Sequence, residues 1–262
     1  MTGKKRKLRK KMKDITLSLI IVILLGVAGF CGFKIWEEFH TMALTEQEVN
    51  ELNLLVKNNI GDAKVNAKFS KKAYEILKSE NKDFKAYLAF DNGLISIPIV
   101  QSTDNDYYLR RSYYGEYADL GTPFFHYASK ETSQNIMVYG HNASANETLM
   151  FSPLRTLLKS DDVFVKNNTF DLYFEDEVRH YEIVAMYWYD LTQDGEYDFT
   201  VTDWYDLDSY NHYFNFVDSK NLIIPRRNHS FTDNFVTFQT CRSKQPNFRL
   251  IVISVETGRE SY

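Results

Sequence analysis

Three residues of this 262-residue chain have side chains that could together perform thiol chemistry. Cys241 ends an apolar, strand-like run, His141 follows a second such run, and Arg249 lies inside a third. A thiolate is a nucleophile, an imidazolium can protonate a departing amine, and a guanidinium can stabilise an oxyanion. If the fold brings the three together, they predict a site for acyl transfer through a cysteine.

Each of these residues also has a simpler interpretation. Cysteine is often buried as a small apolar side chain, and His141 is one of six histidines. Arg249 could extend to water or pair with an acid. Arg242, next to the thiol, is a rival for the oxyanion role, and spacing alone does not decide between the two arginines.

The N-terminus predicts that the rest of the chain lies outside the membrane. Eight Lys and Arg residues precede an apolar stretch of about nineteen residues, which approaches the length that spans a bilayer. The positive-inside rule then keeps the N-terminus in the cytoplasm. A cleaved signal peptide is the alternative, with a loose cleavage match at 27–29, but its apolar part is usually shorter. Since Cys31 lies inside the apolar stretch, Cys241 has no evident disulfide partner.

Charge separates the N-terminus from the remainder. Residues 1–14 carry a net charge of +7 and the whole chain −4, so the remainder carries −11. An acidic region of this size argues against nucleic acid as a partner, because phosphate binding needs clustered Lys and Arg. The boundaries that we expect are a basic cytoplasmic segment at 1–14, a transmembrane signal-anchor at 15–34, a helical region at 35–81 and a barrel at 82–262.

Helical patterns precede strand patterns along the chain. Thr45 and Ser70 are candidate N-caps in the helical region, and a later helix is expected at 204–217, starting after Thr202 or Asp203. Asp91-Asn92-Gly93 is a strong hairpin signal. Short strands with turns between them favour a mainly β fold, a closed or nearly closed barrel. The expected strands are 87–90, 94–100, 123–127, 136–139, 170–174, 179–189, 235–240 and 248–255.

Several motifs resemble those of class B sortases, the membrane-anchored cysteine transpeptidases of Gram-positive bacteria. Thr237-Phe238-Gln239-Thr240-Cys241 is similar to the Thr-Leu-x-Thr-Cys signature of that family, with phenylalanine in place of leucine. The resemblance extends to Tyr139-Gly140-His141-Asn142 and Asp104–Leu109, and covers nearly the whole chain. It implies an eight-stranded sortase barrel with N-terminal helices packed on it.

The resemblance also implies roles for particular residues. His141, Cys241 and Arg249 match the catalytic histidine, cysteine and arginine of the family. Positions that look like substrate contacts in class B are Asn105, Leu109, Tyr139 and Gln239. No metal or other cofactor is implied.

The implied reaction joins secreted proteins to the cell wall. Partners of this family carry a C-terminal sorting motif, expected to be Asn-Pro-x-Thr-like, and an amine of a peptidoglycan precursor resolves the thioester. The sequence leaves open a mainly hydrolytic enzyme and one that uses a pilin lysine. It also leaves open a catalytically silent, membrane-tethered domain that binds surface proteins.

Overall fold

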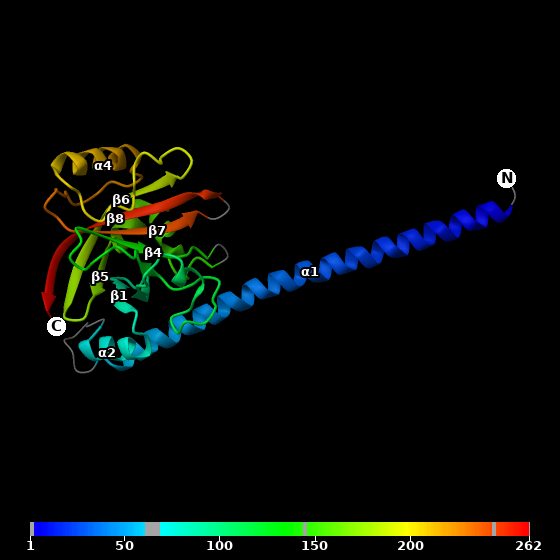
Figure 1. Cartoon of the computed structure of the whole chain (residues 1–262), viewed down its shortest axis with the longest axis horizontal. Coiled ribbons are helices and arrows are strands. Elements are labelled where there is room, and N and C mark those ends of the chain that lie inside the picture. Colours follow the sequence, from blue (N-terminus) through cyan, green and yellow to red (C-terminus); the bar gives the residue numbers. More distant parts are fainter. Residues whose placement is uncertain (1–2, 61–68, 144–145, 243–244, 262) are drawn as a thin grey trace. The chain divides into compact units, whose positions relative to one another are not determined.

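The computed structural model describes residues 3–60, 69–143, 146–242 and 245–261. Two units are distinguished along the chain, residues 1–44 and 45–262. Helix α1 (Gly3–Asn58) forms all of the described part of the first unit and enters the second (Figure 1). Within the described residues, α1 contains one segment that is long and apolar enough to cross a membrane.

The second unit is built on a closed barrel of eight strands, as the sequence pattern predicted. Their order around the barrel is β1-β2-β3-β4-β7-β8-β6-β5. The strands are β1 (Phe84–Phe90), β2 (Ser96–Val100), β3 (Phe124–Phe125), β4 (Asn135–Tyr139), β5 (Thr169–Tyr173), β6 (Glu177–Asp190), β7 (Phe235–Arg242) and β8 (Gln245–Ser261).

Two kinds of strand pairing close the barrel. Antiparallel neighbours include the β1–β2 hairpin, whose turn contains Gly93 at φ +70°, as the hairpin signal predicted. Strands β2 and β3 are parallel, and so are β4 and β7. Strand β8 runs well past the predicted end at residue 255, because β6 continues to pair with it as far as Glu177↔Ser261.

Helices α1 and α2 (Lys71–Glu80) cover one part of the barrel. Their buried side chains Leu52, Val56, Tyr74 and Leu77 join a core cluster with Phe84 of β1. Ser70 is the N-cap of α2, as predicted, since its hydroxyl accepts the N–H of Ala73. The prediction of Thr45 as an N-cap is wrong, because α1 runs through that position without a break.

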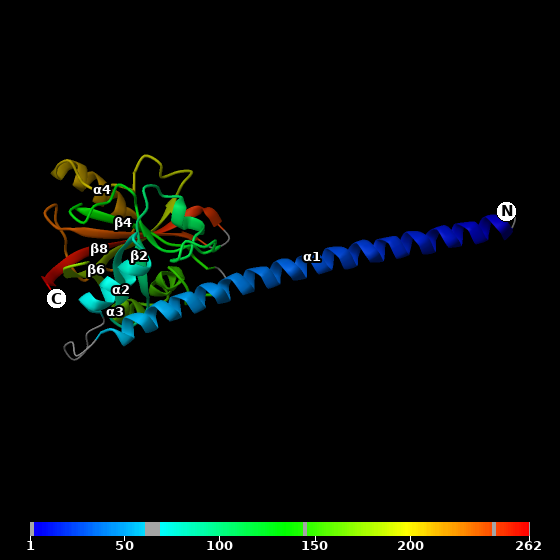
Figure 2. The same ribbon diagram turned by 60° about the horizontal axis from the view of Figure 1, so that its bottom comes forward.

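Helix α4 (Leu207–Lys220) covers a different part of the barrel, and Figures 1 and 2 show it away from α2. It starts later than the sequence predicted, because Asp206 supplies the capping box with Ser209. Its aromatic side chains pack with Tyr187 of β6 and with Trp204, which precedes α4, in a second core cluster. The remaining short helices are η1 (Tyr107–Arg110), η2 (Ser152–Leu158) and α3 (Asp161–Asn167).

Gly140 connects the end of β4 to His141 and lies directly against the ring of Phe151. A Cβ at position 140 would lie 2.4 Å from that ring, which is fully buried and packs on Phe238 of β7. The close-packed Phe151 ring and β7 behind it cannot shift easily to make room for a Cβ at residue 140. This position therefore requires glycine.

We therefore expect Gly140→Ala to lower the free energy of unfolding by roughly 1–3 kcal/mol through overpacking. Urea unfolding of the full-length chain followed by tryptophan fluorescence measures this. Gly195→Ala is the matched control, because a Cβ there would meet nothing within 4 Å. Equal stability of the two variants would contradict the packing argument.

Candidate active site

The carboxyl ends of β4 and β7 bring His141 and Cys241 to the same edge of the barrel. The two strands are parallel, and Tyr139 pairs with Gln239. Each candidate residue follows its member of that pair by two positions. His141 therefore follows the end of β4, while Cys241 lies near the end of β7, and both are at the same edge of the barrel.

Arg249 reaches the same place from the opposite direction. Strand β8 is antiparallel to β7, and the pairing sets Arg249 directly across from Cys241. A register shift follows immediately, between Cys241 and Arg242. The three residues that the sequence separates by up to 108 positions therefore lie on three adjacent strands or strand ends.

A cleft of about 370 Å³ opens at this edge, and all seven predicted site residues line it. Six further residues complete the lining. The full set is Asn105, Asp106, Leu109, Thr122, Phe124, Tyr139, Gly140, His141, Leu191, Phe199, Gln239, Cys241 and Arg249.

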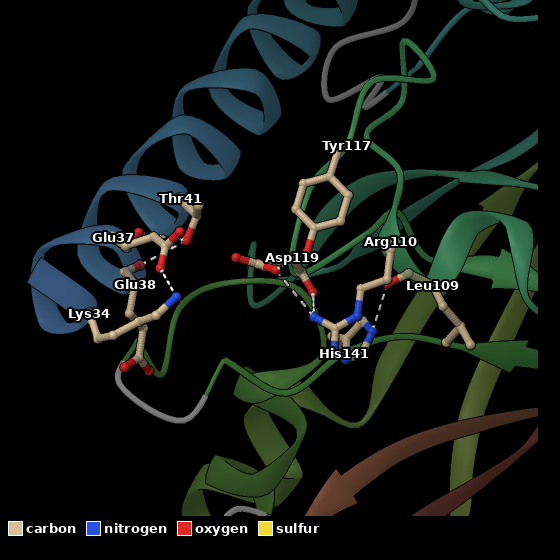
Figure 3. A network of polar contacts seen from close by, with 9 residues as sticks. All are labelled: Lys34, Glu37, Glu38, Thr41, Leu109, Arg110, Tyr117, Asp119 and His141. Carbon is tan, nitrogen blue, oxygen red and sulfur yellow. Dashed lines mark hydrogen bonds and ion pairs between the residues drawn. The ribbon is translucent and has the colours of Figure 1, made fainter. Parts of the chain in front are cut away.

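The His141 ring is held by a main-chain carbonyl. Its Nε2 lies 2.9 Å from the oxygen of Leu109 in η1 (Figure 3). A carbonyl oxygen only accepts hydrogen bonds, so Nε2 carries the hydrogen in both protonation states. Nδ1 is consequently the ring nitrogen that can take up and release a proton.

Burial is the main influence on the charge of His141. It lowers the pKa of the imidazole below its ordinary value of 6.5, because the charged ring loses hydration. The bond to Leu109 opposes this and raises the pKa. Arg110 lowers it, and Asp119 raises it. Arg110 donates to Asp119, so these two charges largely offset one another beside the ring (Figure 3).

Cys241 is half-buried, and its thiol is free. The side-chain amide of Asn142 donates a hydrogen bond of 2.8 Å to the main-chain oxygen of Cys241. The residue after the histidine therefore ties the end of β4 to the end of β7. The sequence places Asn142 in the motif that contains His141 but does not indicate this contact, which depends on the parallel pairing of β4 with β7.

Arg249 donates to the main-chain oxygens of Pro246 and Phe248, at 2.5 and 3.1 Å. In the part of the chain that the structure describes, none of the ion pairs includes it. Its charge is thus uncompensated by a carboxylate within that part. The side chain of Arg242, the rival for the oxyanion role, lies outside the described residues.

The predicted substrate contacts line the walls of the cleft. Asn105 is fixed by accepting the N–H of Tyr127 at 2.9 Å. Tyr139 packs its ring 5.4 Å from that of Phe124, and burial raises the pKa of its phenol to about 12, so it stays neutral. Leu109 and Gln239 are half-buried.

Sequence reasoning missed the wall formed by Leu191 and Phe199. Both follow β6, in the connection that leads to α4. Leu191 is an exposed leucine directly after a strand, but such residues are common and carry no signal alone. Only the closure of the barrel shows that this connection faces the thiol.

The described residues offer no place for a metal ion built from three or more His, Cys, Asp or Glu side chains. Asp104, in the acidic loop before η1, uses its carboxylate to accept the N–H groups of Asp106 and Tyr107. These bonds hold the pKa of Asp104 below its ordinary value.

Comparison with known proteins agrees with this geometry, although no protein-family model matches the sequence. Sortase B of Listeria monocytogenes is 27% identical over 237 residues, which are 90% of this chain and 93% of the relative. The X-ray structure of Clostridium perfringens sortase B is 26% identical, with a TM-score of 0.64, and covers 71% of this chain and 100% of that one.

Two more distant structures support the fold. Bacillus anthracis sortase B in complex with AAEK1 is 22% identical, with a TM-score of 0.70, and covers 83% of this chain and 98% of that one. The Staphylococcus aureus sortase B–substrate complex is 17% identical, with a TM-score of 0.68, and covers 84% and 98%.

The barrel, the cleft and these similarities indicate a sortase-type cysteine transpeptidase. In sequence and in fold, the chain is similar to sortase B.

We expect the His141 imidazole to titrate at lower pH in the folded chain than in the same chain unfolded in urea. The unfolded state then binds more protons, so the contribution of His141 to the free energy of unfolding falls as pH drops below about 6.5. NMR of the imidazole protons, assigned by their loss in His141→Gln, measures both midpoints. A folded midpoint at or above the unfolded one would contradict burial as the dominant influence.

Proposed function

We propose that this chain is a membrane-anchored cysteine transpeptidase that attaches secreted proteins to the cell wall. It cleaves a sorting motif near the C-terminus of the secreted protein and retains the protein as a thioester on Cys241. An amine of a peptidoglycan precursor then releases the protein by forming a new amide.

One observation carries this proposal. Cys241, His141 and Arg249 come from three adjacent parts of the sheet and line one cleft. A nucleophile, a group that exchanges protons and a fixed cation are the set that acyl transfer from an amide needs. A domain that only binds other proteins has no need of that combination.

In the first half-reaction, the thiolate of Cys241 attacks the carbonyl carbon of the scissile peptide bond. Negative charge develops on the carbonyl oxygen, and the guanidinium of Arg249 stabilises it. The carbon–nitrogen bond breaks as Nδ1 of His141⁺ gives its proton to the leaving amine, because a bare amide anion is a poor leaving group. The products are a thioester on Cys241, a free amine and a neutral imidazole.

In the second half-reaction, an incoming amine attacks the thioester carbonyl. Neutral Nδ1 of His141 accepts the proton that the amine must lose, and the carbon–sulfur bond breaks to restore the thiolate. Each full cycle thus returns the starting protonation states. Water attacking in place of the amine would give a carboxylic acid and make the enzyme a peptidase.

Asn105, Leu109, Tyr139 and Gln239 are the residues we assign to recognition of the sorting motif. They combine apolar surface with amide groups in the same cleft. Such a lining suits a short extended peptide, with amide groups bonding its main chain and apolar groups contacting its side chains. An Asn-Pro-x-Thr-like motif is the expected class of substrate.

The apolar part of α1 supports anchoring in the membrane. Residues 15–34 span the bilayer in this proposal, with the basic segment 1–14 in the cytoplasm and residues 82–262, which carry catalysis, outside the cell. Lys34 and Trp36 lie at the C-terminal end of the apolar stretch. Basic and aromatic residues of this kind favour the boundary between membrane and water.

Intact mass spectrometry tests the reaction. We expect wild type, incubated with a library of Asn/Ser-Pro-x-Thr-x peptides, to gain the mass of the acyl fragment on Cys241. Added amine should convert the adduct to a ligated product. Cys241→Ala should form no adduct while keeping the fold. An adduct released only by water would instead identify a hydrolytic enzyme, and no adduct with any peptide would contradict the proposed reaction.

Arg249 and Arg242 can be separated by single substitutions. We expect Arg249→Ala to slow formation of the acyl-enzyme by about 10²–10³-fold, the range for loss of one oxyanion donor. Arg242→Ala is the comparison and should change the rate much less. Single-turnover acylation with the peptide found above measures both, and the reverse order would assign the oxyanion role to Arg242.

A further inference from the structure

We propose that Glu48 of α1 is a positioning residue for His141, acting through η1 and the main-chain carbonyl of Leu109. The N-terminal helices would then orient the group that protonates the leaving amine. This inference rests on the proposed function, because it extends the same site.

The main-chain carbonyl of Leu109 sets the orientation of the His141 ring. Its oxygen is the hydrogen-bond partner of His141 Nε2, at 2.9 Å, and therefore fixes the rotation of the ring (Figure 3). A ring that lost this partner could turn about its bond to Cβ and aim Nδ1 elsewhere. The position of η1 consequently decides where the exchangeable proton lies.

A set of hydrogen bonds joins η1 and the segment after it to α2. Asn81, the C-cap of α2, donates its side-chain amide to the main-chain oxygen of Tyr113 at 2.7 Å and to the hydroxyl of Tyr108 at 3.1 Å. That hydroxyl also lies 2.9 Å from a carboxylate oxygen of Asp83. Tyr113 is fully buried and donates its own hydroxyl to the main-chain oxygen of Leu77, at 2.7 Å.

Glu48 of α1 adds a further hydrogen bond to the segment that follows η1. Its carboxylate accepts the main-chain N–H of Tyr113 at 2.6 Å. Burial raises the pKa of Glu48, so the fold accepts a cost for placing a carboxylate there. The side chain of Leu109 also packs against the core cluster that contains Leu52 and Val56 of α1.

The segment around Gly121 leaves η1 little room to move. Gly121, with φ +53°, returns the chain so close to η1 that a Cβ there would lie 2.1 Å from the oxygen of Tyr108 and 2.7 Å from that of Leu109. The N–H of Thr122 also donates to the oxygen of Tyr108, at 3.1 Å. The bonds to the helical region and the close contact with the segment at Gly121 both restrain the Leu109 carbonyl.

The chemistry of the leaving group can distinguish a misoriented His141 ring from a general loss of binding or folding. A peptide substrate releases an amine and needs a proton from His141, whereas a thioester of the same peptide releases a thiolate and needs none. Disorienting the ring should slow acylation by the amide selectively. Loss of binding or partial unfolding should slow both substrates together.

The experiment measures single-turnover acylation of the full-length chain in detergent micelles by the peptide and by its thioester. The peptide is the one that the mass spectrometry identifies. His141→Gln removes the proton donor altogether, so it shows the largest difference between amide and thioester acylation that the assay can detect. We expect Glu48→Ala to slow amide acylation roughly tenfold, as for a modest misplacement of a catalytic group, and to leave the thioester nearly unchanged.

Two further variants complete the test. Glu48→Gln keeps an oxygen that can accept the Tyr113 N–H and should restore most of the amide rate. Lys71→Ala is the matched control, because Lys71 ties α2 to Asp176 at 2.7 Å and makes no bond to η1. It should leave both rates unchanged.

The outcomes separate this inference from the proposed function. Equal slowing of both substrates by Glu48→Ala, or slowing of neither, in an otherwise active enzyme would overturn the positioning role alone. Failure of Glu48→Gln to restore the amide rate would also overturn it. A wild type that reacts with the thioester but with no peptide would overturn the proposed function, and the positioning role with it.

Discussion

The register of three neighbouring strands is the constraint on which the site depends. Parallel pairing of β4 with β7 brings His141 and Cys241 to the same edge of the barrel, and antiparallel pairing of β7 with β8 sets Arg249 across from Cys241. A shift of one residue in either pairing would turn the affected side chain to the other face of the sheet. The geometry of the cleft is therefore a consequence of main-chain hydrogen bonds buried in the barrel wall.

Packing around the ends of these strands preserves that register. Gly140 admits the ring of Phe151, which in turn packs on Phe238 of β7. The amide of Asn142 then joins the two strand ends through the main-chain oxygen of Cys241. Because each contact bridges β4 and β7, the barrel core and the cleft are held by the same residues.

The histidine differs from the other two site residues in what holds it. Cys241 and Arg249 lie within strands, whereas His141 follows a strand and takes its orientation from the carbonyl of Leu109 in η1. Hydrogen bonds join that short helix and the segment after it to α1 and to the C-cap of α2. Cys241 and Arg249 are thus placed by the sheet, whereas the His141 ring is bonded to η1.

The sequence by itself determined the apolar N-terminal segment, the hairpin turn at Gly93, the N-cap at Ser70 and the approximate positions of all eight strands, because each follows from local composition and spacing. Side-chain chemistry and position singled out Cys241, His141 and Arg249, and motif resemblance supplied the other four candidate residues of the cleft. The start of α4 also has a local cause, the Asp206–Ser209 capping box, which the sequence reasoning missed. Only the tertiary structure decided the length of β8 and the contributions of Asn142, Leu191 and Phe199, because these depend on which strands become neighbours, and pairing between distant segments leaves no local signal in the chain.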